Sequence, residues 1–369
     1  MLLQHPLAIT MWDFSWLERR WTGAGYRDIA AALDQLAQRG YDAVRIDAYP
    51  HLAAADPQRS WELVPCWSVH AWGAPSPTRV QIQPHLNHFI ELAGQRGIRV
   101  ALSSWFREDA TDQRKLIPTP QRHAEIWTAV LDQINDAGLL HNILFVDLCN
   151  EWPLPQWAPF FHGPPQGEAW ALEPSIHWMQ TAIASVQRRF PNLPCCFSFT
   201  GNFRQIPAAD LPFMDLLEPH IWMATCSDFY QRIGYSFQRF DETGYQRLAN
   251  LARPLFSAHP QHWLSLLDDA ITTAARWSTA QQKPLVTTEC WGLVDYKDAP
   301  LLEWDFIQTL CDHGTRSAAR TGRWAAIATS NFCGPQFAGM WDNIPWHRAL
   351  TDTIHNAALP PDMPLWWTA

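Results

Sequence analysis

Short apolar runs alternate with amphipathic helical stretches along most of this chain. The runs expected as strands cover residues 7–12, 41–47, 98–102, 142–151, 195–199, 214–223, 283–289 and 324–329. Helices are expected between them; in the first, Ile29, Leu33 and Leu36 share one face and Gly40 follows its end. Such alternation predicts a parallel sheet covered by helices, and eight repeats predict a closed (β/α)8 TIM barrel.

The lengths of the connections also fit a barrel. Long insertions are expected after strands 2, 4, 6 and 8, whereas helix-to-strand links such as Gly40-Tyr41 and Gly97-Ile98 are short. A β/α barrel carries its functional residues in the loops at the carboxyl ends of its strands, so a site is expected at that end. The 369 residues suffice for one such barrel, and we predict a single domain over residues 1–369.

Two of the expected strands end in a glutamate. One run begins as a short apolar stretch and ends in Asn150-Glu151, and another ends at Glu289. A carboxylate at the end of an almost uncharged strand costs free energy unless something uses it, although a Glu that simply leaves the core is the structural alternative. Strands 4 and 7 of a barrel face each other across its top. Two facing carboxylates supply the acid and the nucleophile or base that cleavage of a glycosidic bond needs.

The second strand adds a pair of opposite charges. Period-two alternation directs Val44 and Ile46 toward the helix layer, and Arg45 and Asp47 toward the barrel interior. Arg45 and Asp47 form either a structural pair or part of a site. Their position at the carboxyl end of the strand favours the site.

The fifth and sixth strands contribute further polar candidates. Glu218, His220 and Trp222 share one parity and are expected to point inward. Pro219 lies between them and cannot donate to a sheet, so a bulge or an irregular strand end is expected there. Asn202 follows the end of the fifth strand and is a further candidate for substrate binding.

Tryptophan is unusually frequent, with 22 residues. Trp is bulky and carries an N–H group, so a chain this rich in it is expected to place several in clefts, where flat apolar sugar faces stack on the rings. By position, the candidates at the site are Trp12, Trp105, Trp291 and Trp341. For each of these four, packing in the core is the equally strong alternative.

These motifs resemble those of a known family. Asn150-Glu151 and Glu289 resemble the paired motifs of retaining clan A glycoside hydrolases, and the closest group is the cellulase-like, or sugar-binding cellulase-like, family. Val44-Arg45-Ile46 resembles the strand whose Arg supports the nucleophile, and residues 288–292 resemble the nucleophile strand. His220-Ile221-Trp222 resembles a His-x-Tyr motif in which Trp replaces Tyr, which removes a hydroxyl that commonly contacts the nucleophile. The strand pattern covers most of the chain, but only these short motifs match closely.

The resemblance implies roles for individual residues. Glu151 is implied as acid/base, Glu289 as nucleophile and Asn150 as a hydrogen-bond donor to the sugar 2-hydroxyl. A retaining reaction needs carboxyl groups about 5–5.5 Å apart. The nucleophile must stay ionised, which a neighbouring cation such as Arg45 would favour. The expected function is hydrolysis of a β-glycosidic bond in small oligosaccharides or glycosides, with no metal and no other cofactor.

Other functions are known on barrel scaffolds. A metal-dependent hydrolase would want a His-x-His pair at an early strand end, where this chain has Met11-Trp12-Asp13. A Schiff-base aldolase needs an inward lysine at a strand end. The only lysines are Lys115, Lys283 and Lys297, and none of them ends an expected strand on its inward face. A non-catalytic carbohydrate-binding protein remains an open alternative because fold does not determine function, although the presence of both Glu favours catalysis.

The net charge and the cysteines bear on the binding partners and the cellular compartment of the protein. A net charge of −9 and a pI of about 5.9 argue against a nucleic acid partner, because phosphate binding wants a basic face. The eight cysteines form no C-x-x-C pair, and the first residues lack the features of a signal peptide, so a reduced, cytoplasmic protein is expected. No apolar run is long enough for a membrane span. The sugar, the linkage and the oligomeric state stay open.

Overall fold

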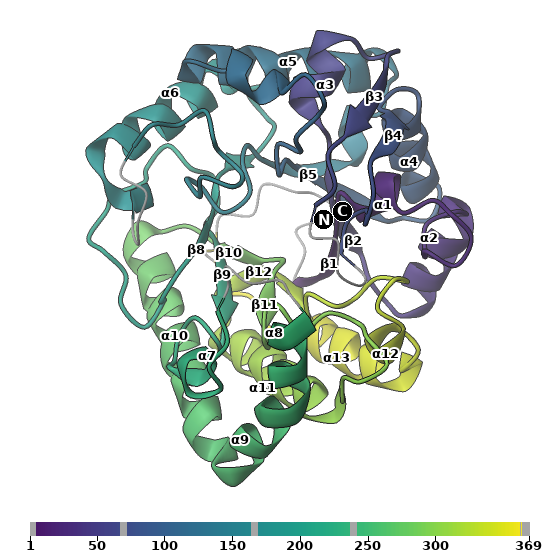
Figure 1. The fold of residues 1–369 in the computed structure, drawn as a ribbon. Coiled ribbons are helices and arrows are strands. Elements are labelled where there is room, and N and C mark those ends of the chain that lie inside the picture. Colours follow the sequence, from purple (N-terminus) through teal and green to yellow (C-terminus); the bar gives the residue numbers. More distant parts are fainter. Residues whose placement is uncertain (1–4, 67–71, 164–168, 237–241, 362, 364–369) are drawn as a thin grey trace.

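The protein folds as a (β/α)8 barrel, here described from a computed structural model that covers residues 5–66, 72–163, 169–236, 242–361 and 363. Figure 1 shows the strands gathered in the centre and the long helices placed around them. The barrel strands are β1 (Leu7–Asp13), β2 (Ala43–Asp47), β5 (Arg99–Ser103), β6 (Ile143–Asp147), β7 (Cys195–Cys196), β8 (Ser198–Thr200), β9 (Glu218–Trp222), β10 (Leu285–Thr287), β11 (Cys290–Trp291) and β12 (Trp324–Ala328). The predicted fold is therefore confirmed.

Two of the predicted strands are interrupted. Seven strands form one parallel sheet in the order β10-β12-β1-β2-β5-β6-β7, and β11-β9-β8 form a second sheet. The fifth strand is divided into β7 and β8, and the seventh into β10 and β11. The amide of Val286 donates to Leu217 at 2.9 Å and the amide of Leu217 donates to Pro284 at 3.0 Å, which closes the ring between the sheets. Glu289 lies in the interruption between β10 and β11, so neither strand's ladder holds its backbone.

Long helices cover the outside of the strands. They are α2 (Ile29–Gln38), α4 (His85–Gly94), α5 (Pro120–Asp136), α6 (Glu173–Arg189), α10 (Pro260–Gln281), α11 (Asp305–Thr321) and α13 (Ile344–His355). Side chains cap the N-termini of α2 and α5: the Asp28 carboxylate accepts from the Ala31 amide at 2.9 Å, and Thr119 caps α5, which has Pro120 at its first position. Within the described residues, no helix has both the length and the apolar character that crossing a membrane requires.

The insertions at the carboxyl ends of the strands contain structure of their own. After β2 come α3 (Pro50–Ala55) and an antiparallel hairpin of β3 (Ser60–Leu63) and β4 (Thr78–Gln81). After β9 come α7 (Phe229–Arg232), α8 (Glu242–Arg247), the π-helical η4 (Leu248–Ala252) and α9 (Arg253–Ala258). The remaining short helices are α1 (Ser15–Glu18), η1 (Gln113–Leu116), η2 (Leu140–Asn142), η3 (Ala169–Ala171) and α12 (Ala338–Trp341). Residues 48–84 and 224–260, predicted as loops, thus contain helices and a hairpin.

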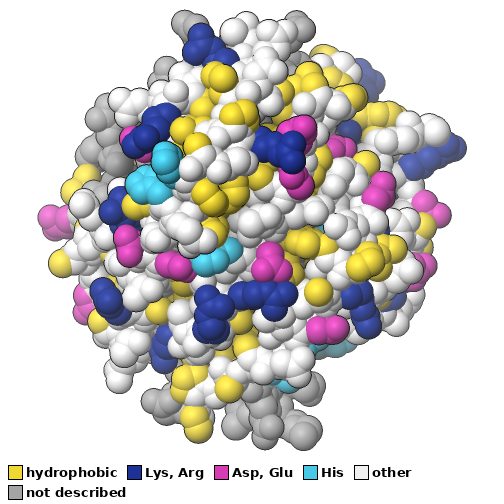
Figure 2. Space-filling view, turned by 90° about the horizontal axis from the view of Figure 1, so that it is seen from below, with side chains coloured by type: hydrophobic (Ala, Val, Ile, Leu, Met, Phe, Trp, Pro, Cys, Tyr) yellow, Lys and Arg dark blue, Asp and Glu magenta, His cyan; other side chains and the backbone are white. Residues whose placement is uncertain are grey.

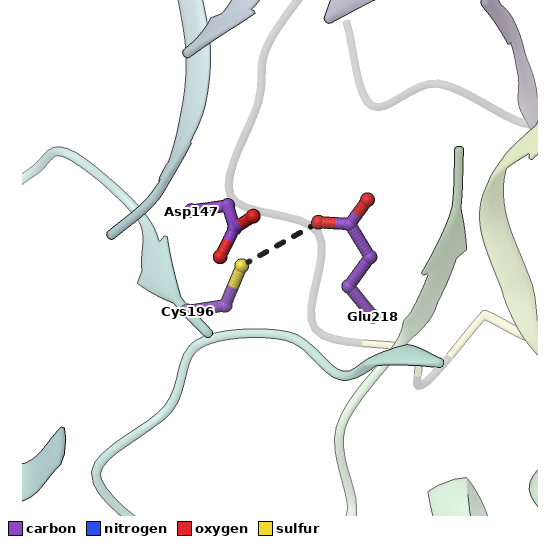
Figure 3. Close-up of side chains that lie close together, drawn as sticks. All are labelled: Asp147, Cys196 and Glu218. Atoms are coloured by element: carbon purple, nitrogen blue, oxygen red, sulfur yellow. Dashed lines mark hydrogen bonds between the residues drawn. The ribbon is translucent and has the colours of Figure 1, made fainter. Parts of the chain in front are cut away.

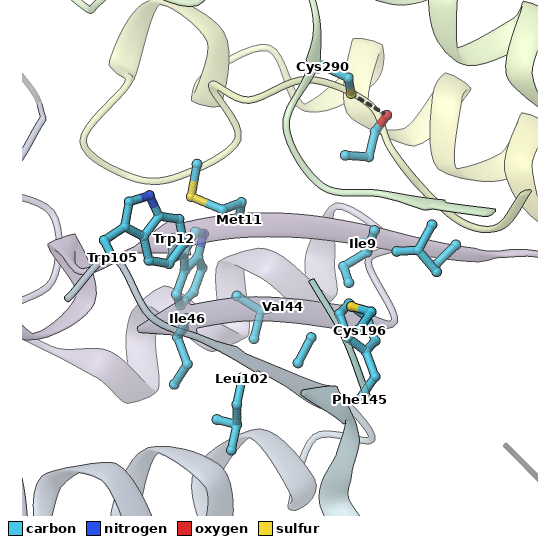
Figure 4. Packing of buried hydrophobic residues seen from close by; sticks show 14 of the residues in the cluster. Ile9, Met11, Trp12, Val44, Ile46, Leu102, Trp105, Phe145, Cys196 and Cys290 are labelled. Atoms are coloured by element: carbon cyan, nitrogen blue, oxygen red, sulfur yellow. Dashed lines mark hydrogen bonds between the residues drawn. The ribbon is translucent and has the colours of Figure 1, made fainter. Parts of the chain in front are cut away.

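The core fills both faces of the strands. Every residue of β1 and β2 is buried, because the inner face meets the barrel interior and the outer face meets the helices. Figure 4 shows Ile9, Val44, Leu102 and Phe145 packed together from neighbouring strands. On the face of the molecule drawn in Figure 2, basic and acidic side chains lie interspersed.

The sixth strand differs from its prediction. β9 begins only at Glu218, and before it Leu217 makes a single bridge to Leu285. Pro219 pairs in regular register with Phe199, and its carbonyl accepts a hydrogen bond from the Thr287 hydroxyl. Of the two alternatives predicted at Pro219, the bulge is absent, and the irregularity lies at the beginning of the strand, just before Glu218.

Candidate active site

The two glutamates predicted at strand ends lie in turns just beyond the strands. β6 ends at Asp147, and Glu151 follows it with a backbone φ of 47°, in the left-handed region. Its amide donates to Ser198 Oγ at 2.9 Å, which fixes this unusual conformation. Glu151 and Glu289 are 8% and 2% exposed, so both carboxyl groups are largely withdrawn from water.

His220 lies between these two carboxyl groups. Its Nδ1 is 3.1 Å from Glu151 Oε1 and 3.8 Å from Glu289 Oε2. One oxygen of each carboxyl group and one ring nitrogen of His220 all lie within 4.8 Å of one another. The fold therefore brings together three residues from β9 and from the turns beyond β6 and β10, which are far apart in the sequence.

Arg45 reaches this group through the barrel interior. Its Nη1 donates to Glu289 Oε1 at 3.1 Å and to Thr288 Oγ1 at 3.0 Å. Its Nη2 donates to Asn150 Oδ1 at 2.7 Å. Since Arg45 holds the oxygen of the Asn150 amide, the NH2 group of that amide is left as a donor; it is buried and has no partner among the described residues.

A second group of acids lies on the other side of Arg45. Figure 3 shows Asp147, Cys196 and Glu218 converging, with a hydrogen bond of 3.8 Å from the Cys196 thiol to Glu218 Oε2. Asp147 pairs directly with the Arg45 guanidinium, and Glu218 lies 3.7 Å from Arg45 Nε. Burial raises the pKa of the Cys196 thiol well above its usual value, so it stays protonated. Arg45 thus supplies the positive charge between these acids.

Burial and charge shift the proton equilibria of this site. Burial raises the pKa of Glu289 to about 7, and the charge of Glu151 adds to this, while His220 and Arg45 act against it. For His220, burial alone lowers the pKa, but the carboxylates of Glu289, Glu151 and Glu218 outweigh it and raise the pKa to about 10. His220 is therefore a cation at neutral pH, and it stabilises negative charge on its carboxylate neighbours.

A cavity of about 330 Å³ opens onto the two glutamates. Its wall includes Glu151, Glu289, Trp72, Trp222 and Asp295. The other residues that line it are Leu154, Gln156, Thr200, Gly201, Thr225 and Val294. The cavity lies at the carboxyl ends of the strands, where barrel proteins bind their substrates.

Comparison with protein families identifies the chain. The model of the cellulase-like family, described as sugar-binding cellulase-like, matches residues 9–355. The chain belongs to this family. A comparison with curated protein sequences finds no match.

Solved structures include similar folds. A candidate glycoside hydrolase from Parabacteroides distasonis shares 46% sequence identity with this cellulase-like protein, over 97% of this chain and 96% of that one, with a TM-score of 0.95. A GH5_18 protein from Streptomyces cattleya in complex with GlcNAc is 16% identical over 97% and 83% of the two chains, with a TM-score of 0.53. An exo-β-1,4-mannosidase from Opitutaceae bacterium strain TAV5 is 13% identical over 95% and 60%, with a TM-score of 0.52. The last two share the fold with this cellulase-like protein.

Of the tryptophans predicted at the site, two lie close to the glutamates. Trp222 lines the cavity, and its indole N–H is buried with no hydrogen-bond partner among the described residues. Trp105 lies beneath the site, where the Arg45 guanidinium stacks over its ring at 4.7 Å from the centroid. Trp105 is fully buried and does not line the cavity, so its contact is with Arg45.

The other three tryptophans lie in the core and do not line the cavity, which is the alternative that the sequence left open for them. The indole N–H of Trp12 donates to the Cys333 carbonyl at 3.0 Å, and that of Trp291 to the Ala328 carbonyl at 2.9 Å. Trp341 donates to Gln35 Oε1 at 2.8 Å, outside the strands. Each indole N–H finds a partner within the protein, so these rings are stable without a ligand.

Asp47 and Asn202 also lie outside the cavity wall. Asp47 accepts hydrogen bonds from the amides of Tyr49 at 2.7 Å and Trp105 at 3.1 Å, so it shapes the turns after β2 and β5. Burial raises the pKa of Asp47 to about 7. The chain turns outward at Gly201, with a φ of 149°, and leaves Asn202 exposed beside a separate surface hollow.

The structure adds two residues that the motifs did not single out. Trp72 lies in the long insertion after β2. Trp72 lines the cavity, and its indole donates to Asp13 Oδ2 at 2.6 Å. Asp295 enters the cavity from the loop after β11. Its only signal in the sequence was its position after a strand that carries a catalytic candidate.

Proposed function

We propose that this cellulase-like protein is a retaining glycoside hydrolase that cleaves a β-glycosidic bond by double displacement. One observation carries the proposal: the carboxyl groups of Glu151 and Glu289 both contact His220 and lie within 4.8 Å of each other at their nearest oxygens, in the wall of a cavity. A retaining reaction requires carboxyl groups about 5–5.5 Å apart, whereas inverting enzymes leave room for a water molecule between groups about 6.5–9.5 Å apart. The short separation favours retention.

We assign Glu289 as the nucleophile. In the first step a Glu289 oxygen attacks the anomeric carbon, and the bond from that carbon to the leaving oxygen breaks. The hydrogen bond from Arg45 at 3.1 Å and the positive charge of His220 stabilise the ionised carboxylate that this attack needs. Asn150, whose buried NH2 group has no partner among the described residues, is positioned to donate to a sugar hydroxyl.

We assign Glu151 as the acid and base. It donates its proton to the leaving oxygen in the first step. In the second step its carboxylate takes a proton from water, the water oxygen bonds to the anomeric carbon, and Glu289 is released. The product then has the configuration of the substrate. The hydrogen bond between His220 Nδ1 and Glu151 Oε1, at 3.1 Å, orients the Glu151 carboxyl group in both steps.

The cavity favours small substrates. Its volume of about 330 Å³ is near the lower end of the range for small-molecule sites. This supports short oligosaccharides or simple glycosides. We further propose that residues 1–369 act as one catalytic domain in a reducing, cytoplasmic setting. The family match over residues 9–355 and the eight free cysteines support this.

One observation favours a second function, carbohydrate binding without catalysis. Trp222 occupies the position of Tyr in the His-x-Tyr motif that residues 220–222 resemble, so the hydroxyl that commonly contacts a nucleophile is absent. Its bulky ring in the cavity wall suits sugar binding.

A panel of aryl α- and β-glycosides tests both functions, with the first-formed product anomer followed by NMR. Hydrolysis of a β-glycoside with release of the β-anomer is the expected result. Release of the α-anomer would contradict the double displacement. Saturable sugar binding by the folded protein without hydrolysis of any glycoside would favour the second function.

A further inference from the structure

Asp295 places a third carboxyl group in the cavity wall. It lies in the loop after β11, in the same segment as Glu289, and is 2% exposed. Its Oδ2 is buried and has no hydrogen-bond partner among the described residues. A buried acceptor without a partner costs free energy, and a ligand with a hydroxyl donor would remove that cost.

The loop holds this carboxyl group in place before any ligand arrives. The Asp295 amide donates to the Tyr230 hydroxyl at 3.1 Å, and the Tyr296 amide donates to the Leu293 carbonyl at 3.0 Å. The Tyr296 hydroxyl donates to the Glu303 carbonyl at 2.7 Å, which ties the loop to the segment before α11. A group held in this way loses little conformational freedom when it binds a ligand.

A buried lysine lies behind the same wall. The Lys297 ammonium donates to the Val294 carbonyl at 2.5 Å and lies 3.9 Å from the centroid of the Trp72 ring. Burial raises the pKa of Asp295 to about 7, while the charge of Lys297 and the hydroxyls of Tyr230 and Tyr235 lower it. Lys297 thus favours the ionised form of Asp295 without itself lining the cavity.

The charges of the wall limit which sugars fit. Glu151, Glu289 and Asp295 all line the cavity, and its lining includes no lysine or arginine among the described residues. A sugar acid would bring a further negative charge against three carboxyl groups, and the wall itself offers no lysine or arginine to pair with it. Neutral hydroxyl groups instead donate well to a carboxylate.

We propose that Asp295 binds a hydroxyl group of the glycone, and that the glycone is an uncharged sugar. The assignment of the cavity as a sugar site rests on the proposed function, but the role of Asp295 is tested by binding as well as by turnover. Asp295 does not take part in the bond changes; it selects and orients the sugar.

The experiment measures binding of neutral methyl β-glycosides, their monodeoxy analogues and the corresponding methyl β-uronides. Trp72 and Trp222 line the cavity, so intrinsic tryptophan fluorescence reports occupancy without hydrolysis. The variants are Asp295→Ala and the isosteric Asp295→Asn. The control is Asp298→Asn, in the same loop, whose Oδ1 accepts from the Gly339 amide at 3.1 Å outside the cavity.

The expected results are specific. The best neutral glycoside should bind Asp295→Ala about 10- to 100-fold more weakly than the parent protein, and Asp298→Asn should bind like the parent. One monodeoxy analogue should bind the parent weakly but lose nothing further in Asp295→Ala, because both changes remove the same hydrogen bond. The uronides should bind the parent at least tenfold more weakly than the neutral sugars.

Other outcomes separate this inference from the proposed function. Hydrolysis by the parent, with unchanged binding and KM in both Asp295 variants, overturns the role of Asp295 alone. Tight binding of a uronide overturns the uncharged glycone. Sugar binding that depends on Asp295 without hydrolysis overturns the glycosidase and leaves the role of Asp295 standing. A folded parent that neither binds nor hydrolyses any of these sugars overturns both. Thermal melting of Asp295→Asn checks that this variant is folded, so that weaker binding can be assigned to the lost carboxylate.

Discussion

The guanidinium of Arg45 donates a 3.1 Å hydrogen bond to the carboxylate of Glu289 across the barrel interior. The same guanidinium also pairs with Asp147 and lies 3.7 Å from Glu218, so a single cation serves three carboxylates. This sharing explains why Arg45 does not overcome the effect of burial, which raises the pKa of Glu289 to about 7.

The first prediction concerns the pH dependence of activity. Because the nucleophile must be ionised, kcat/KM should rise with pH through about 7, the pKa of Glu289. Arg45→Met removes a cation that lowers this pKa, so the acidic limb should move upward by about 1–3 units. Arg45→Lys keeps the charge and should move it less. A pH–rate profile measures this, and an unchanged limb in an active Arg45→Met variant would limit Arg45 to a structural role.

Arg45→Met also tests the balance of charge in the barrel. It leaves Asp147 buried without its cation and Glu218 with only His220, 3.7 Å away, so the free energy of unfolding should fall by about 3–5 kcal/mol. Denaturant titration measures this change. The kinetics of the variant should therefore be measured well below its melting temperature.

The second prediction distinguishes the two glutamates. Glu151→Ala should slow natural substrates by about 100- to 10,000-fold, because their leaving groups need a proton, and should affect activated aryl glycosides much less in the first step. Azide needs no general base, so it should restore turnover of this variant and give a glycosyl azide of retained configuration. In Glu289→Ala, azide should attack from the opposite face and give the inverted azide.

The configuration of each glycosyl azide, measured by NMR, checks this assignment. The reverse result, an inverted azide from Glu151→Ala and a retained azide from Glu289→Ala, would mean that the two roles are exchanged. No rescue of either folded variant, with an active parent enzyme, would count against the pair.

The third prediction separates a cavity tryptophan from a core tryptophan. Trp222→Phe shrinks a buried ring that lines the cavity and should raise KM about three- to tenfold, with a loss of stability comparable to that of Trp12→Phe. Trp12→Phe removes a buried hydrogen bond to Cys333 and should lower the free energy of unfolding by about 1–3 kcal/mol with KM unchanged. Steady-state kinetics and thermal melting of both variants give the comparison. Equal effects of Trp222→Phe and Trp12→Phe on KM would contradict the assignment of Trp222 to the cavity and Trp12 to the core.

The fourth prediction concerns the helix packed behind the Glu289 segment. A Cβ added at Gly314 in α11 would lie 2.6 Å from the Trp291 ring, so Gly314→Ala should destabilise the protein by about 1–3 kcal/mol, despite the better helix propensity of Ala. Gly292→Ala is the matched control, because the nearest atom to its Cβ is 3.5 Å away. Melting temperatures measure both changes; a stable Gly314→Ala variant would show that Trp291 can shift freely.

The fifth prediction concerns stability and pH. Burial raises the pKa of Asp13, Asp47, Asp295 and Glu289 to about 7. A carboxyl group whose pKa is higher in the folded state stabilises the fold fully below its unfolded pKa, and this stabilisation is lost as the pH rises through its folded pKa. The melting temperature should therefore fall as the pH rises from about 5 to about 8.

Asp47→Asn removes one of these titrations. Each proton taken up on folding contributes about 1.4 kcal/mol per pH unit, so the pH dependence of stability should become shallower by up to that amount. Calorimetry across this pH range measures the slope. A slope identical to that of the parent protein would mean that Asp47 keeps an ordinary pKa.

The barrel itself follows from local patterns in the sequence. A period of two identifies a strand and a period of 3.6 identifies a helix, and both depend on neighbours within a few residues. The order of the elements then leaves little choice, because parallel strands joined by helices close in one hand. Glu151 and Glu289 could be found in the same way, since charges at the ends of apolar runs stand out locally.

The composition of the cavity wall depends on contacts between distant segments. Trp12 and Trp222 both belong to buried strands, and their sequence neighbours do not reveal that one indole donates to Cys333 while the other faces the cavity. Asp295 and Trp72 come from separate insertions and meet only when both loops fold over the barrel. The pKa of Glu289 likewise depends on burial and on His220 and Arg45. Local patterns determined the scaffold and the catalytic candidates, whereas only the tertiary structure decided their neighbours and charge states, because desolvation and packing sum over the whole chain.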